Sequence, residues 1–238
     1  MIEEENKKME FNDREMNEFT YKQALKYDNR NYIQYYCSLL KTKHILIFSF
    51  YTSNDYNSKI IKINLFFVGF VSNYVINALF FNDDTMHKIY EDHGKFDILY
   101  QLPQIIYSYI ISTAFDSLLN LLALSEDDIL TFKRIRKNTN LNKMTKIIKN
   151  KLNIKFALYF IISTILLLCF WYYLSIFCAI YRNTQYHLLK DTMVSFGLSL
   201  LTPLGLYLLP GIFRIPSLYN KGSNRSYLYK LSQFLQIF

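Results

Sequence analysis

The chain has 238 residues, of which 51% are hydrophobic and 18% aromatic, and 27 Lys and Arg against 19 Asp and Glu give it a net charge of +8. This apolar content excludes a disordered chain, and the low counts of 6 Gly and 3 Cys exclude collagen-like and disulfide-scaffold proteins. Most charges lie in blocks between long windows that carry none. The pattern predicts an all-α integral membrane protein, a helical bundle with four transmembrane helices.

The N-terminal segment, residues 1–59, starts with acidic residues and lacks the basic start and apolar core of a cleavable signal peptide. Its stretch 32–52 is apolar on either side of Lys41, Lys43 and His44. Each lysine would cost about 2.5–3.5 kcal/mol at the centre of a bilayer, which outweighs the gain from the apolar flanks. We therefore predict an interfacial or protein-packed helix at 32–52, with a fifth span as the alternative.

A helix needs about 20 apolar residues to cross roughly 30 Å of hydrocarbon. Four windows are long enough: 63–81, 103–124, 157–181 and 192–213. The only charged residue within them is Asp116. In the last window, Pro203 and Pro210 predict a kinked or interrupted helix, which is either an ordinary proline kink or a broken helix of the kind that lines transporter cavities.

The basic residues predict the orientation of these spans. The region before the first span, the segment 125–156 and the tail after residue 213 together hold 23 Lys and Arg, whereas the two remaining loops hold 4. The positive-inside rule then places both termini in the cytosol. The expected organisation is a cytosolic segment 1–59, a membrane domain 60–213 and a cytosolic tail 214–238.

Asp116 is predicted to face the interior of the bundle, because an ionised carboxylate facing lipid is costly. Gly69, Asn73 and Asn77 recur every four residues on the first span, a spacing that suits close packing and interhelical hydrogen bonds. We expect Asp116 to bond to Asn73, Asn77 or Asn120 as a structural contact. The alternative is a role for Asp116 in a proton or cation relay.

The first outer loop, residues 82–97, contains two histidines and five carboxylates. A possible divalent-metal site there comprises His87, Glu91, His93 and Asp83, with oxygen ligands suited to Ca²⁺ and imidazoles suited to Zn²⁺. The spacing is not that of an EF-hand. A solvated acidic loop is the simpler interpretation, and we favour it.

The inner loop carries a basic stretch with apolar residues among the charges. Lys133, Arg134, Arg136 and Lys137 are predicted to contact anionic lipid headgroups, at about 1 kcal/mol for each cation near the surface. The alternative is a loop that is basic only because it lies inside. Nucleic-acid binding is not expected of a loop tethered between two spans.

Motifs of catalysis are missing from the sequence. It contains no nucleophile elbow, P-loop, dinucleotide fingerprint or HExxH string, and its three cysteines form no CxxC pair. We therefore expect neither an enzyme nor a bound cofactor.

Four strings carry a resemblance to known proteins: residues 77–91, residues 101–108, residues 170–175 together with 182–185, and residues 209–214. From about Lys41 to its end, the chain resembles the C-terminal membrane region of large multi-pass proteins of AT-rich protists such as ciliates. It is more distantly similar to the early membrane helices of polycystin-1-like proteins, without their PLAT domain or channel helices. The resemblance implies the same topology and adds no catalytic residue.

The sequence thus predicts a non-enzymatic anchoring or assembly module of a larger receptor-like or channel-associated complex. Its expected partners are the lipid bilayer, anionic headgroups and other membrane proteins. The alternative is a transporter or channel component that uses Asp116 and the proline-interrupted last span. A third hypothesis is a divalent-cation sensor built on the outer loop.

Overall fold

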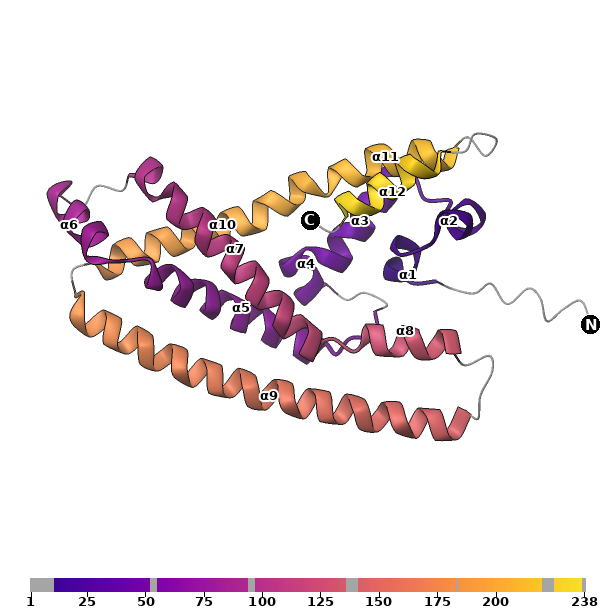
Figure 1. The fold of residues 1–238 in the computed structure, drawn as a ribbon, viewed down its shortest axis with the longest axis horizontal. Helices are drawn as coiled ribbons and strands as arrows, with labels where there is room; N and C mark the ends of the chain where they lie inside the picture. Colours follow the sequence, from indigo (N-terminus) through magenta and orange to yellow (C-terminus); the bar gives the residue numbers. More distant parts are fainter. Residues whose placement is uncertain are drawn as a thin grey trace, which may run out of the picture. The chain divides into compact units, whose positions relative to one another are not determined.

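The computed structural model describes residues 11–51, 55–93, 97–135, 141–182, 184–219 and 225–236, and for residues 98, 134, 135, 141 and 142 it describes the backbone alone. Within these ranges the chain is helical and has no strand, so the all-α prediction is confirmed (Figure 1). The helices are α1 (Asp13–Asn17), α2 (Tyr21–Tyr27), α3 (Tyr32–Lys43), α4 (Ile45–Phe50), α5 (Lys59–Leu79), α6 (Asp83–Glu91), α7 (Ile98–Ala123), α8 (Glu126–Ile135), α9 (Leu141–Ile180), α10 (Gln185–Leu206), α11 (Leu208–Tyr219) and α12 (Ser226–Leu235).

Four of these helical stretches are long and apolar enough to cross a bilayer, in agreement with the four predicted windows. They are Lys59–Leu79, Leu99–Ala123, Lys143–Ile180 and Gln185–Tyr219. The largest difference from the prediction is in α9, which has 40 residues because the basic stretch before the apolar window is helical too. Lysine ends a hydropathy window but is a good helix former, so charge does not mark the start of this helix.

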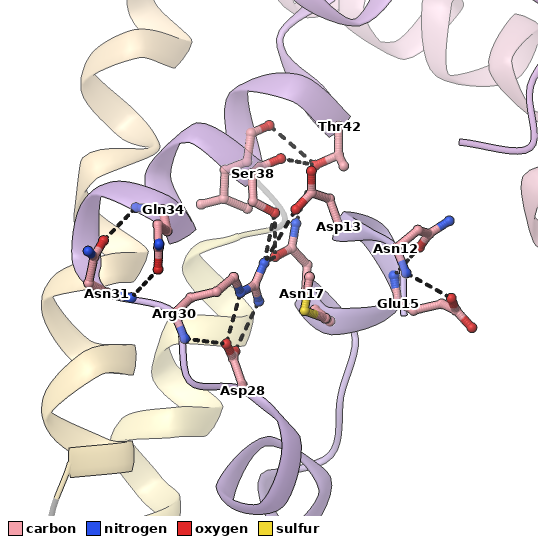
Figure 2. A network of polar contacts seen from close by, with 12 residues as sticks. Asn12, Asp13, Glu15, Asn17, Asp28, Arg30, Asn31, Gln34, Ser38 and Thr42 are labelled. Atoms are coloured by element: carbon pink, nitrogen blue, oxygen red, sulfur yellow. Dashed lines mark hydrogen bonds and ion pairs between the residues drawn. The ribbon is translucent and has the colours of Figure 1, made fainter. Parts of the chain in front are cut away.

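The short helices near the N-terminus begin at capping boxes, in which a polar side chain and the residue three positions later bond to each other's backbone N–H groups. The pairs are Asn12 with Glu15, Thr20 with Gln23, and Asn31 with Gln34. Two of them appear in Figure 2. These caps fix the starts of α1, α2 and α3, none of which is long enough to be stable alone.

The chain divides into two compact units, one formed by residues 57–200 and the other by 1–56 together with 201–238. In the unit 57–200, α5 packs against both α7 and α9, which also touch each other (Figure 1). One apolar cluster in this unit gathers Ile61, Leu65, Val68, Leu119, Ala123 and Tyr159. A second gathers Ala78, Phe81, Ile89, Phe177 and Leu188.

In the other unit, α11 packs against α12 and α3. The stretch 32–52 forms two helices, α3 and α4, separated at His44. Tyr35 and Leu39 of α3 are fully buried in a cluster with Tyr207. This stretch therefore packs against protein, and each of its helices is shorter than the roughly 20 residues that a span requires.

Candidate functional site

The interface between α5 and α7 carries polar side chains at regular intervals. Asp116 of α7 lies against Gly69 of α5, where an added Cβ would be 3.2 Å from the Asp116 Oδ1 atom. Asn73 Nδ2 donates to Ser112 Oγ at 3.3 Å, and Asn77 Nδ2 donates to Asn73 Oδ1 at 3.1 Å. All three predicted intramembrane residues therefore lie along one interface.

The predicted bond between Asp116 and an asparagine is not formed. Among the described residues Asp116 has no hydrogen bond or ion pair, and Asn120 is exposed. The reason is the register of the two helices. It places Asp116 opposite Gly69, and it places Asn73 where its side chain donates a hydrogen bond to Ser112.

Helix α10 runs antiparallel to α5. Its Phe196 packs edge-on against Phe66 and Phe70, whereas its Leu188, two turns earlier, belongs to the same cluster as Ala78 near the other end of α5. Helix α7 is also antiparallel to α5, but it slopes the other way from α10, and the two helices cross (Figure 1).

Polar residues of α7 and α10 also meet where these two helices cross. Gln104 Nε2 of α7 donates to Asp191 Oδ2 of α10 at 3.0 Å. Ser108 and Gln101 lie about one turn from Gln104 on α7, and Ser195 and His187 lie about one turn from Asp191 on α10. All four of these residues are buried.

We call the whole set the polar column. It comprises Asn73 and Asn77 of α5, Gln101, Gln104, Ser108, Ser112 and Asp116 of α7, and His187, Asp191, Thr192 and Ser195 of α10. From Gln101 to Asp116 it rises about 22 Å along α7, most of the thickness of a bilayer's hydrocarbon core.

The middle of the polar column holds five side chains that are 0% exposed, and each has an oxygen atom without a hydrogen-bond partner among the described residues. They are Asn77, Ser108, Asp191, Thr192 and Ser195. Buried polar atoms are normally bonded, and leaving one unpaired costs about 1–3 kcal/mol. These five oxygens, on α5, α7 and α10, are therefore available to a ligand.

Apolar side chains close the polar column beyond Asp116. One turn past Asp116 on α7 comes Leu119, then Ala123, and both pack with Ile61 and Leu65 of α5 in the first apolar cluster. The column therefore does not continue to the end of the helix pair. On this side it ends in apolar packing.

The other unit contains a buried arginine in a quite different environment. Arg214 of α11 is 0% exposed, and its Nη2 is 2.8 Å from Asp28 Oδ2. Its guanidinium lies 4.8 Å from the centres of both the Tyr35 and Tyr229 rings, and it also donates to the backbone oxygens of Met16 and Asn17. Every side of this cation is thus occupied by a ring, a carboxylate or a carbonyl.

A second arginine completes this network (Figure 2). Arg30 donates to both carboxylate oxygens of Asp28, and its Nη1 donates to Asn17 and Ser38. Burial alone would raise the pKa of Asp28, but hydrogen bonds and positive charge from Arg30, and then from Arg214, outweigh it and hold the pKa below its ordinary value. Asp28 therefore stays ionised between two arginines.

The outer-loop residues form no metal-binding group, since the described residues contain no cluster of three or more His, Cys, Asp or Glu side chains that could hold an ion. His87 Nε2 and Glu91 Oε1 are 3.1 Å apart on one face of α6, as their spacing predicts. Asp83 instead accepts a hydrogen bond from the Tyr181 hydroxyl. His93 follows the helix in a left-handed backbone conformation, with φ of 50°.

The residues predicted to contact lipid headgroups are only partly described by the structure. Lys133 lies on α8, Arg134 is described by its backbone alone, and Arg136 and Lys137 lie outside the described residues. Nearby, Lys151 and Lys155 of α9 bond to the two oxygens of Asp128 at 2.6 and 2.8 Å. This cluster fastens α8 to α9.

The last apolar window is interrupted at Tyr207, between α10 and α11, as the prolines predict. Two tyrosine hydroxyls bind the backbone beside the interruption, with Tyr36 donating to Leu204 O and Tyr32 to Leu208 O. The buried polar residues of α10 end at Ser195, before Pro203. The interruption therefore contributes nothing to the polar column.

An apolar groove of about 710 Å³ lies along α9. It is lined by Val71 of α5 and by α9 residues at helical spacing, among them Leu168, Trp171 and Cys178. No polar column residue lines it. Its lining is apolar apart from Thr164 and Ser175.

No match is found for this chain. Family models, curated proteins and solved structures were all compared, and none is similar to it. The polar column, the arginine network and the groove are therefore interpreted from their own chemistry.

The sequence analysis missed Asp191, Arg214 and Asp28. The signal that could have found the first two is their position, because Asp191 and Arg214 directly bracket the charge-free window 192–213. A charged residue at the edge of a window marks the end of a span in a hydropathy search, but here both edge residues are fully buried.

Proposed function

We propose that this chain is a non-enzymatic multi-pass membrane protein in which α5, α7, α9 and the α10–α11 stretch each cross the bilayer, with both termini in the cytosol. The length and apolar composition of these four stretches support this topology. So does the distribution of Lys and Arg, 23 in the segments assigned to the inside and 4 in those assigned to the outside.

We further propose that the protein acts as a carrier of a small polar cargo, such as a cation or protons, through the polar column. The supporting observation is the set of five fully buried side chains with unpartnered oxygens around Asp191. In a bilayer no water compensates such groups, so an intramembrane carboxylate is retained where a pathway needs it. This is the transport role that the sequence analysis gave as the alternative to assembly, with Asp191 added and the proline interruption left out.

The closure of the column beyond Asp116 favours a carrier over a channel. Leu65, Leu119, Ile61 and Ala123 fill the space between α5 and α7 on the cytosolic side of the column. Passage across the membrane then requires this apolar contact to open, as alternating access demands.

Flux into liposomes tests this function. The purified protein would be reconstituted, and uptake of alkali cations or protons followed under an imposed gradient. Wild type should conduct above empty liposomes, Asp191→Asn should fall to the empty-liposome rate, and Asp116→Asn should be slowed. Asp97→Asn, at the exposed start of α7, is the matched control, since Asn caps a helix as well as Asp does. A wild type with no gradient-driven flux of any of these ions contradicts the proposal.

Assembly remains the second candidate, and the groove along α9 is the observation that favours it. In this case a transmembrane helix of a partner protein fills the groove. Replacing Trp171, which is 76% exposed, by Ala would then change the mass of the particle extracted in mild detergent. Asp191→Asn would leave that mass unchanged. The opposite pattern, flux lost in Asp191→Asn with an unchanged particle in Trp171→Ala, supports the carrier.

A further inference from the structure

The charge and the chemical type of the unpartnered groups restrict what the polar column can hold. Around its middle these groups are one carboxylate oxygen of Asp191 and the neutral oxygens of Thr192, Ser195, Ser108 and Asn77. Hydroxyl, amide and carboxylate oxygens are ligands for hard cations. Each of the five side chains is 0% exposed, so an ion bound here would exchange its water for protein oxygens.

We propose that Asp191 is the charged ligand of a binding site for one dehydrated alkali-metal cation, of the Na⁺ or K⁺ class, completed by the oxygens of Thr192, Ser195, Ser108 and Asn77. This inference deepens the proposed carrier function and rests on it for the position of the site within the bilayer. It names the cargo class and the residues that bind it.

Charge balance selects a monovalent ion. One carboxylate and one monovalent cation leave no net charge, whereas a divalent ion at the same place would leave an uncompensated charge in a medium of low polarity. The other carboxylate of the column is Asp116, which is about two turns further along α7 than Ser108 and lies against Gly69. Zinc and similar metals lack their ligands, since no cluster of His, Cys, Asp or Glu exists among the described residues.

The carboxylate is also oriented for this purpose. Gln104 Nε2 donates to Oδ2 of Asp191 at 3.0 Å, which leaves Oδ1 as the free atom. A bound ion on Oδ1 therefore does not compete with the one hydrogen bond that holds the side chain. Thr192 and Ser195, on the same helix as Asp191, bring their hydroxyls to the same buried side of α10.

Cation-dependent stability of the purified full chain tests this site without any need for flux. Thermal unfolding in detergent would be measured over a range of NaCl, KCl or LiCl, with choline chloride holding the ionic strength constant. The midpoint of wild type should rise with at least one alkali cation and saturate, because a ligand that binds only the folded state stabilises it. Choline alone should give no shift.

Three variants assign the effect to the site. Asp191→Asn should fold and lose the cation-dependent shift entirely. Thr192→Val, which keeps the shape and removes one oxygen, should keep the shift but require about tenfold more cation, the factor that corresponds to one lost interaction of ordinary strength. Glu126→Gln, a buried carboxyl in the same unit that accepts a bond from Asn57, should keep the wild-type concentration dependence.

The outcomes separate this inference from the carrier function. A midpoint that does not respond to any alkali cation, that responds to Ca²⁺ or Mg²⁺ instead, or that shifts equally in Asp191→Asn overturns the cation site. Proton-driven flux in liposomes without any cation effect would then leave the carrier function standing with protons as its cargo. A cation shift that depends on Asp191 in a protein without flux would support the site and remove the carrier.

Discussion

Buried charge is handled in opposite ways in the two units. In the unit of residues 1–56 and 201–238, Arg214 and Asp28 form an ion pair. Two tyrosine rings and two backbone oxygens also contact Arg214. In the unit 57–200, Asp191 is equally buried but has a single hydrogen bond and a free oxygen. The comparison teaches that burial alone does not mark a functional group. A charge whose every bond is satisfied holds structure together, and one that lacks bonds is available to a ligand.

The largest expected effect comes from breaking the satisfied network. Arg214→Met should lower the free energy of unfolding by about 3–5 kcal/mol, because it leaves Asp28 buried with only one of its two arginines. The denaturant midpoint of the detergent-solubilised protein measures this. The double variant Arg214→Met/Asp28→Asn should recover part of the loss, since the charge left behind is then removed too. An unchanged midpoint in Arg214→Met would mean that the network is not what stabilises this unit.

Removing the charge of Asp191, one of whose oxygens lacks a partner, should change the free energy of unfolding in the opposite direction. In buffer without alkali cations, Asp191→Asn should raise the free energy of unfolding by about 1–3 kcal/mol, the range for a buried group that lacks a partner. The amide oxygen can still accept the bond from Gln104. The same denaturant measurement checks it, with wild type in the same buffer as reference. A loss as large as that of Arg214→Met would show that the two units do not differ in the way proposed here.

Lowering the pH should weaken the network of Asp28 with its two arginines. The pKa of Asp28 is lowered in the folded chain, so its contribution to stability is complete above the unfolded value of 3.8 and is lost as the pH falls through the lower folded value. Wild type should therefore lose stability on acidification below about pH 4, and Asp28→Asn should show a flatter profile there. Unfolding midpoints between pH 7 and pH 3 test this. Asp128, whose pKa is also held low, by Lys151 and Lys155 against the effect of burial, keeps part of the dependence in the variant. Equal slopes for the two proteins would exclude Asp28 as a source.

Effects smaller than that of Arg214→Met are expected from replacing three glycines that differ in how closely other atoms approach them. Gly211→Ala would place Cβ 2.6 Å from the Tyr32 ring, and this ring is held by its bond to Leu208 O, so we expect a loss of about 1–3 kcal/mol. Gly69→Ala would place Cβ 3.2 Å from Asp116, which has no bond to keep it in place, so the loss should be smaller. Gly197 has no atom within 4 Å, and its replacement by Ala should stabilise α10 by about 0.5–1 kcal/mol. Midpoints of thermal unfolding measure the effects of the three variants. A larger loss of stability in Gly69→Ala than in Gly211→Ala would contradict this prediction.

Hydropathy was enough to find the four apolar helices, because the number of consecutive apolar residues is a property of the sequence alone. The same is true of the four-residue spacing that placed Asn73 and Asn77 on one face of α5. Neither could show which residues lie opposite. Asp116 was expected to bond to an asparagine, and only the register between α5 and α7 reveals that Gly69 lies there.

The two buried charges were missed for a reason built into the method. A search for charge-free windows ends each window at a charged residue, so Asp191 and Arg214 fall outside the span 192–213. Such flanking residues are then expected to face water. The partner of Arg214 is also remote in sequence, since Asp28 lies 186 residues earlier. Pairing over that distance depends on how α11 packs against α3, which local pattern does not encode.

The length of α9 has a mechanical consequence. Its 40 residues make a rod of about 60 Å, and Tyr159, fully buried and bonded to Asn64 at 2.6 Å, holds it close to its midpoint. If α9 tilted by about 10° about this contact, its two ends would move by about 5 Å in opposite directions. One arm ends at Phe177 in the second apolar cluster, and the other carries Lys151 and Lys155 to Asp128. A tilt about Tyr159 would move these two contacts in opposite directions, and it would move Lys151 and Lys155 less, since they lie only about 12 and 6 Å from Tyr159 along the helix.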